Sequence, residues 1–124
     1  MEARVAALLD NDFCCADAVA HELVRFLKLA SIAQEDELYS LMPSPIVGAA
    51  WRMLITATEL YPEVCDWISS GAGPIHHDPL QRHDDASDMR ERYERTLEAY
   101  EDHFLEPPPE SIWPPDFLEP GPLR

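Results

Sequence analysis

The stretch SPIVGAAWRMLITAT, residues 44–58, decides the fold. Ser44 followed by Pro45 is typical of a helix start, because a serine side chain caps free amide groups and proline fits the first helical position. Apolar residues then return at intervals of three and four, which places them on one face of a helix. The members of this stripe are Val47, Ala50, Trp51, Leu54 and Thr58. The stretch therefore predicts a core helix, and Tyr61-Pro62 predicts the kink or break that follows it.

Two further segments show the same helical period. Residues 15–33 predict an amphipathic helix, with polar residues such as His21, Glu22 and Lys28 away from the apolar stripe. That stripe consists of Val19, Leu23, Phe26, Leu27 and Ala30. Another helix is expected to begin near Asp85 or Ser87. Its repeating apolar positions are Met89, Tyr93, Leu97, Tyr100 and Phe104.

The fold class follows from these segments. No stretch alternates cleanly between apolar and polar residues as a β-strand would, so the chain is expected to be all-α. We expect a compact bundle of three to five helices within a helical domain, residues 1–104. The expected core residues are Phe26, Trp51, Leu54, Tyr61, Tyr93, Tyr100 and Trp113.

A proline-rich tail, residues 105–124, follows the helical domain and holds seven of the 12 prolines. It cannot be helical, because each proline ring removes an amide donor and favours extended geometry in the residue before it. It also carries apolar residues that a solvated tail would not need, among them Ile112, Trp113, Phe117 and Leu118. We therefore expect an extended segment packed across the helices. The alternative is a free polyproline-type ligand.

The charge of the chain limits its partners. The 124 residues include 24 acidic and nine basic side chains, a formal net charge of −15. Nucleic-acid backbones and anionic membrane surfaces bind clustered cations, so neither is expected as a direct partner. No apolar run approaches the roughly 18 residues of a membrane span, and the N-terminus does not resemble a signal peptide. We expect a cytoplasmic protein whose partner presents a basic surface.

The three cysteines indicate neither a disulfide framework nor a zinc site. Cys14 and Cys15 are adjacent and Cys65 stands alone, which leaves an odd number and no recognised ligand spacing. We expect three buried, reduced thiols.

One local cluster resembles a ligand set. His76 and His77, followed by Asp78, lie in a stretch bounded by glycine and proline. Adjacent side chains of an extended segment point to opposite sides, so at most one histidine would normally enter a given site. One interpretation is that one histidine hydrogen-bonds a helix end and the other is solvated. The competing hypothesis is a metal site that uses His76, His77 or both.

No motif fixes a reaction. The sequence contains no nucleophile elbow, phosphate-binding loop or dinucleotide fingerprint. We therefore assign no catalytic residue and expect no cofactor, with a divalent metal at the histidine pair as the alternative.

Over residues 20–115, the order and spacing of several elements resemble the DUF1399 family, also described as glycine-rich domain-containing protein-like. The matching elements are Arg25-Phe26-Leu27, Pro43-Ser44, Trp51, Thr58, Tyr61, Ile75-His76-His77 with Pro79, Tyr93, Thr96, Tyr100, Phe104, Pro107-Pro108 and Trp113-Pro114. In that family pattern an aspartate and two histidines stand where this chain has Gly48, Arg52 and Leu54. The resemblance implies a metal or small-ligand site near the His-His loop in related proteins. This chain would then be a degenerate member, in which Arg52 beside His76 or His77 leaves an anion pocket open.

Three functional hypotheses follow. The first is a small acidic helical module for protein interaction or regulation. The alternative is a metal- or anion-binding protein, enzymatic or not, centred on Arg52, His76, His77 and Asp78. The second alternative is an acidic nucleic-acid mimic, which requires carboxylates arrayed along one surface at phosphate-like intervals.

Overall fold

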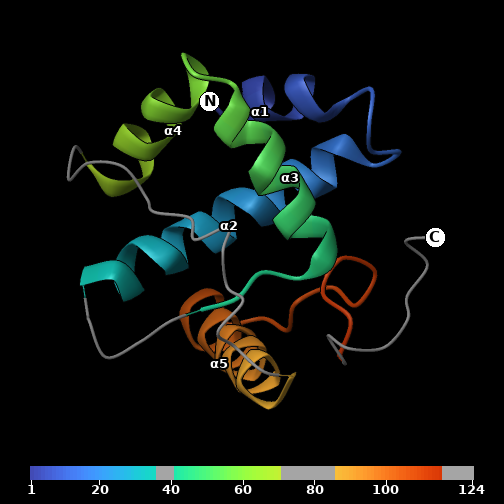
Figure 1. Cartoon of the computed structure of the whole chain (residues 1–124), viewed down its shortest axis with the longest axis vertical. Helices are drawn as coiled ribbons and strands as arrows, with labels where there is room; N and C mark the ends of the chain where they lie inside the picture. Colours follow the sequence, from blue (N-terminus) through green and yellow to red (C-terminus); the bar gives the residue numbers. More distant parts are fainter. Residues whose placement is uncertain (36–40, 71–85, 116–124) are drawn as a thin grey trace.

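The computed structural model describes residues 1–35, 41–70 and 86–115 of the chain. These ranges form five helices and no β-strand (Figure 1). The helices are α1 (Glu2–Leu9), α2 (Ala16–Glu35), α3 (Pro45–Thr56), α4 (Leu60–Ser69) and α5 (Ala86–Phe104). The predicted all-α class is thus confirmed for the described part of the chain, which also contains a short first helix, α1, that the sequence analysis did not identify.

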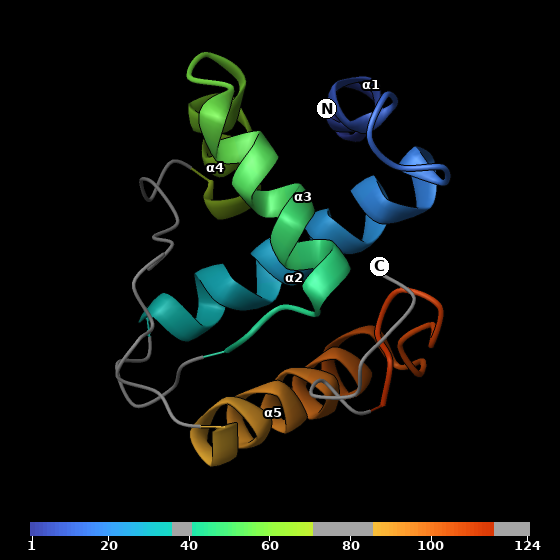
Figure 2. The same ribbon diagram turned by 45° about the vertical axis from the view of Figure 1, so that its right-hand side comes forward.

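α2 is the central element. It crosses the middle of the molecule and contacts each of the other four helices (Figures 1 and 2). α1, α3 and α4 lie on one side of it and α5 lies on the other. Among helix pairs, α5 packs only against α2, so contacts outside the helices must help to hold it in place.

α3 begins as the sequence predicted. The Ser44 hydroxyl accepts a 3.1 Å hydrogen bond from the amide of Val47, and Pro45 is the first helical residue. The predicted break at Tyr61-Pro62 is wrong by a few residues. α3 already ends at Thr56, and Pro62 lies in the first turn of α4, where a missing amide donor breaks no helical hydrogen bond. Thr58 is therefore exposed between two helices and does not extend the apolar stripe.

The core combines aromatic residues from distant parts of the chain. The Phe26 ring lies 5.3 Å from that of Trp51 and 6.0 Å from that of Trp113. Tyr93 stacks on Trp113 at 6.2 Å, and Tyr100 lies 5.9 Å from the same ring. Of the expected core residues, Phe26, Trp51, Leu54, Tyr93, Tyr100 and Trp113 are buried, whereas Tyr61 is half-buried. Trp113 thus joins α2 to α5 through a single aromatic cluster.

The segment after α5 returns to the helices. Leu105 ends α5 with a φ of 60°, a left-handed conformation that turns the chain. Trp113 is only 1% exposed, and the Pro114 carbonyl accepts a 2.6 Å hydrogen bond from the Tyr93 hydroxyl. Within residues 105–115, Ile112 and Trp113 are therefore buried against the bundle. Phe117 and Leu118 lie outside the described residues.

Two expectations about burial are wrong. Cys14 and Cys15 are exposed and only Cys65 is buried, because the adjacent pair lies in the turn between α1 and α2. Glu22 was expected on the polar face of an amphipathic helix, yet it is 6% exposed. α2 contacts helices on both of its sides, so most of its circumference lies inside the protein.

Candidate functional site

Of the four predicted ligand residues, only Arg52 lies within the described part of the chain. His76, His77 and Asp78 lie outside the described residues, so the expected convergence of these side chains stays a prediction. Leu54, which stands where the family pattern has a histidine, is fully buried and belongs to the core.

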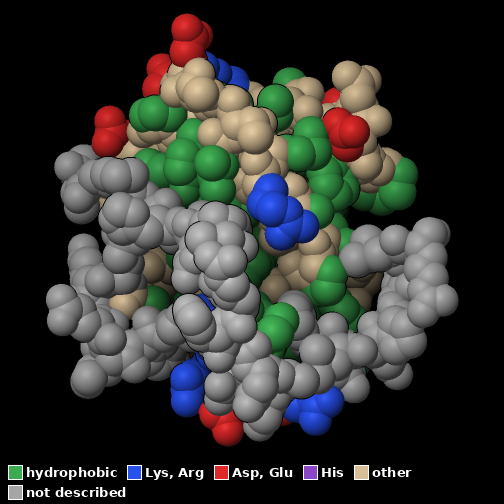
Figure 3. Space-filling view, viewed as in Figure 1, with side chains coloured by type: hydrophobic (Ala, Val, Ile, Leu, Met, Phe, Trp, Pro, Cys, Tyr) green, Lys and Arg blue, Asp and Glu red, His purple; other side chains and the backbone are tan. Residues whose placement is uncertain are grey.

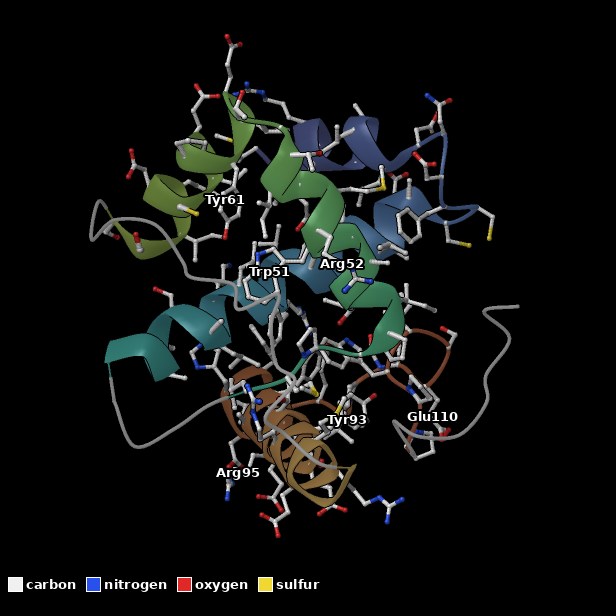
Figure 4. The ribbon with its side chains drawn as sticks, in the orientation of Figure 1. Trp51, Arg52, Tyr61, Tyr93, Arg95 and Glu110 are labelled. Carbon is white, nitrogen blue, oxygen red and sulfur yellow. The ribbon has the colours of Figure 1, made fainter. Side chains whose placement is uncertain are left out.

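Arg52 extends from α3 into solvent. A Cβ atom built on Gly48, one turn earlier, would lie 3.6 Å from the Arg52 Nη1, so the guanidinium lies back over Gly48. Within the described residues Arg52 forms no hydrogen bond or ion pair (Figure 4). In the same orientation, Figure 3 shows a basic side chain over α3, where the described surface next to it is apolar and neutral and the carboxylates lie toward the edge of this face.

A second polar group of residues is buried beneath the C-terminal segment. One oxygen of the Glu22 carboxylate accepts hydrogen bonds from the Tyr100 hydroxyl at 2.7 Å and from the Trp113 Nε1 at 3.0 Å. Arg25 donates to the Tyr100 hydroxyl at 2.9 Å and to the Glu106 carboxylate at 2.6 Å. Burial raises the pKa of Tyr100 to about 12, and the hydrogen bond to Glu22 acts in the same direction. These contacts tie α2, α5 and the C-terminal segment together, so we assign the group a structural role.

A pocket of about 350 Å³ lies between α2 and α5. The described residues that line it are Leu29, Ile32, Ala33, Leu41, Ala99, Asp102 and His103. The α2 wall is wholly apolar, and Ile32 remains 52% exposed although its helix is the most buried in the protein. Asp102 and His103, both exposed, add one carboxylate and one imidazole. We call this site the α2–α5 pocket; it is large enough to take a bulky apolar side chain beside a polar or cationic group.

The helix that forms the second wall carries negative charge. Glu94, Glu98, Glu101 and Asp102 are all exposed along the second half of α5. Arg95, on the same half, has its guanidinium 3.9 Å from the Glu91 carboxylate, which offsets part of its charge. At 100° per residue, Asp102 and Arg95 share the face of α5 that carries Ala99 and His103, whereas Glu94 and Glu101 lie on the opposite side of the helix. Asp102 is therefore the carboxylate that α5 places at the α2–α5 pocket.

An exposed tryptophan lies on the other side of Ile32. Trp67 of α4 is 47% exposed, and the Lys28 ammonium lies 5.8 Å from the centre of its ring, within reach of a cation–π contact. Lys28 and Ile32 are neighbours one turn apart on α2. The charged Lys28 therefore separates the Trp67 ring from Ile32 along α2.

Sequence reasoning missed the α2–α5 pocket because its lining comes from two helices far apart in the chain. One signal was present in the sequence. Ile32 lies opposite the predicted apolar stripe of α2, and a large apolar residue on a polar face indicates a contact beyond the core.

The described residues do not supply a complete metal site. No group of three or more His, Cys, Asp or Glu side chains among them could hold a metal ion. None of the described helices has the length and hydropathy that a membrane span requires.

Comparison with protein-family models, with curated proteins and with solved structures found no match.

Proposed function

We propose that this chain is a small acidic interaction module, and that the α2–α5 pocket receives an apolar side chain from a basic segment of a partner protein. The observation that carries the proposal is the pocket itself, in which the half-exposed Ile32 faces the same opening as the exposed Asp102.

The apolar contacts would supply most of the affinity. Interfaces depend on a few large side chains that fill well-packed pockets, and a pocket of about 350 Å³ fits one such side chain. Burying a Leu or Phe side chain contributes about 1.5–3 kcal/mol. Trp67 offers a second apolar contact along the same side of α2.

Charge would select the partner. The net charge of −15 and the exposed Asp102 at the pocket favour a segment rich in lysine and arginine, and the net charge disfavours nucleic acid and anionic lipid. Such complementarity mainly accelerates association and weakens as salt rises. A cytoplasmic location is part of this proposal.

In this proposal the proline-rich tail has a structural role. A free polyproline ligand would keep its apolar residues exposed, whereas Ile112 and Trp113 are buried against the helices. We propose that the tail holds α5 in place as one wall of the pocket.

The family resemblance and the anion- or metal-binding hypothesis remain a second candidate. The observation in favour is the exposed Arg52 guanidinium, which lies over Gly48 on the outer side of α3. The partners expected there, His76, His77 and Asp78, are part of that candidate. Titration of the protein with inorganic phosphate, compared with the Arg52→Gln variant, tests it.

Selection from a displayed peptide library tests the interaction module. We expect enrichment of peptides that combine several basic residues with one large apolar residue, and loss of their binding in the Ile32→Glu variant. The matched control is Ala18→Glu, which adds the same charge at another exposed position of α2, about 20 Å away. Absence of enrichment, or equal loss of binding in both variants, would contradict the proposed function.

A further inference from the structure

A pair of exposed thiols lies at the junction of α1 and α2. The Cys14 thiol donates a hydrogen bond to the Cys15 sulfur, and the two Sγ atoms are 3.9 Å apart. All three cysteines are free, but Cys65 is buried whereas Cys14 and Cys15 are exposed. The interaction module proposed above does not use either sulfur.

The backbone on both sides of the pair is fixed. The Phe13 amide donates to the Leu9 carbonyl at 3.1 Å, and Phe13 packs against the core. On the other side, Ala16 is buried, and the Cys15 carbonyl accepts a 2.9 Å hydrogen bond from the amide of Val19. The turn that carries the two exposed sulfurs is therefore fixed on both sides. Because the backbone is already ordered, less conformational entropy is lost when both sulfurs bind one ligand.

A direct disulfide suits this geometry poorly. The Cα atoms of adjacent residues are about 3.8 Å apart across a trans peptide bond, whereas disulfides usually span about 4.4–6.8 Å between Cα atoms. The described residues contain no cis peptide bond. Oxidation of the pair to an internal disulfide would therefore require the turn to distort.

A single thiophilic atom between the sulfurs fits without such distortion. Two sulfurs that each lie about 2.3 Å from one atom are separated by about 3.3 Å at a right angle and by about 4.6 Å when the three atoms are in line. The separation in the structure is 3.9 Å. A cation between the sulfurs would also offset the repulsion between two thiolates.

We propose that Cys14 and Cys15 form a two-thiolate binding site for a soft, thiophilic centre of the kind represented by Cu(I) and trivalent arsenic. A zinc ion normally takes four protein ligands in a structural site, and no cluster of three or more candidate ligands exists among the described residues. Thiolate ligands favour soft ions, so we expect a soft centre that accepts two thiolates.

Phenylarsine oxide is the probe for the binding of trivalent arsenic. Two arsenic–sulfur bonds form, the arsenic–oxygen bond breaks, and the oxygen leaves as water with the two thiol protons; no atom changes its oxidation state. Cu(I) is the probe for metal binding. Two copper–sulfur bonds form, and the two thiol protons are released to the buffer. Comparison of the two probes shows which soft centre the site prefers.

The experiment compares the reduced wild-type chain with Cys14→Ser, Cys15→Ser and, as the matched control, Cys65→Ser. Intact mass spectrometry after an excess of a monothiol measures the arsenical adduct, and competition with a chromophoric chelator under anaerobic conditions measures Cu(I). We expect one equivalent of at least one probe on the wild type and on Cys65→Ser. We expect the affinity to fall about a hundredfold in either of the other variants, because the second thiol acts at high effective concentration.

Three results would overturn the proposal: neither probe remains bound to the wild type, a single serine variant binds as tightly as the wild type, or Cys65→Ser loses binding to the same extent. Circular dichroism of each variant confirms that the fold is retained. The Cys14 and Cys15 sulfurs are exposed, so serine at either position is expected to leave the helices intact.

Discussion

The Tyr100 hydroxyl donates a 2.7 Å hydrogen bond to the Glu22 carboxylate, although the two residues are 78 positions apart in the chain. The same carboxylate oxygen accepts from the Trp113 Nε1, so one buried acid joins α2, α5 and the segment after α5. Because α5 contacts no other helix than α2, this hydrogen-bonded group is a main determinant of where α5 lies. The position of α5 in turn defines the α2–α5 pocket.

Removing the buried acid should destabilise the protein. Glu22→Ala leaves the Tyr100 hydroxyl and the Trp113 indole without their acceptor, and each buried donor left unsatisfied costs about 1–3 kcal/mol. We expect the free energy of unfolding to fall by about 3 kcal/mol in chemical denaturation. The exposed Glu94→Ala should change it by less than about 0.5 kcal/mol. A loss below about 1 kcal/mol for Glu22→Ala would show that the group is not a structural tie.

Alkaline pH should weaken the fold through its buried tyrosines. Burial raises the pKa of Tyr100 from 10.0 to about 12, and burial also raises the pKa values of Tyr61 and Tyr93. Between these two pH values the unfolded chain loses phenolic protons that the folded chain retains, so stability is fully present below pH 10 and falls as pH rises toward 12. Denaturation midpoints between pH 7 and 12 should therefore decline more steeply for the wild type than for Tyr100→Phe. Parallel curves would contradict the assignment of Tyr100 as a buried, neutral donor.

The end of α5 stores backbone strain. Leu105 has a φ of 60° and is 87% exposed, so its side chain offers little burial in return for a left-handed conformation that costs about 1 kcal/mol. We expect Leu105→Gly to raise the free energy of unfolding by about 0.5–1 kcal/mol. Leu105→Ala retains the Cβ atom and should give no such gain. Equal stability of the two variants would show that no strain is relieved there.

The two tryptophans near α2 should differ in their effect on stability. Trp51 is 5% exposed and packs edge-on against Phe26, so Trp51→Ala should cost about 3–5 kcal/mol. Trp67 is 47% exposed, and Trp67→Ala should cost less than about 1 kcal/mol. Urea denaturation of both variants measures the difference. Similar losses for the two variants would disprove the placement of α3 as a core helix.

Local sequence signals were sufficient to locate the start of α3. Ser44 and Pro45 mark a helix start through interactions within one turn, and the structure places α3 at that point. The helix break after Thr56 was harder to locate, because Pro62 is compatible with the first turn of a new helix as well as with a kink.

Features that depend on distant partners could not be derived in this way. Glu22 is a charged residue in a helix, and only the donors from Tyr100 and Trp113 make its burial possible. Cys14 and Cys15 are exposed because the chain turns between α1 and α2, and α1 itself is too short to give a strong periodic signal. The α2–α5 pocket likewise exists only once α5 is placed beside α2.

Isothermal titration of one selected basic, apolar peptide into the wild-type chain and into Ile32→Glu tests the proposed interaction module most directly. We expect binding to the wild type that weakens with salt, at least about a tenfold loss of affinity in Ile32→Glu, and a change below about twofold in the control Ala18→Glu. Nuclear magnetic resonance shifts on binding should map to Leu29, Ile32 and Ala99. Unchanged affinity in Ile32→Glu, or shifts confined to residues away from the α2–α5 pocket, would contradict the account.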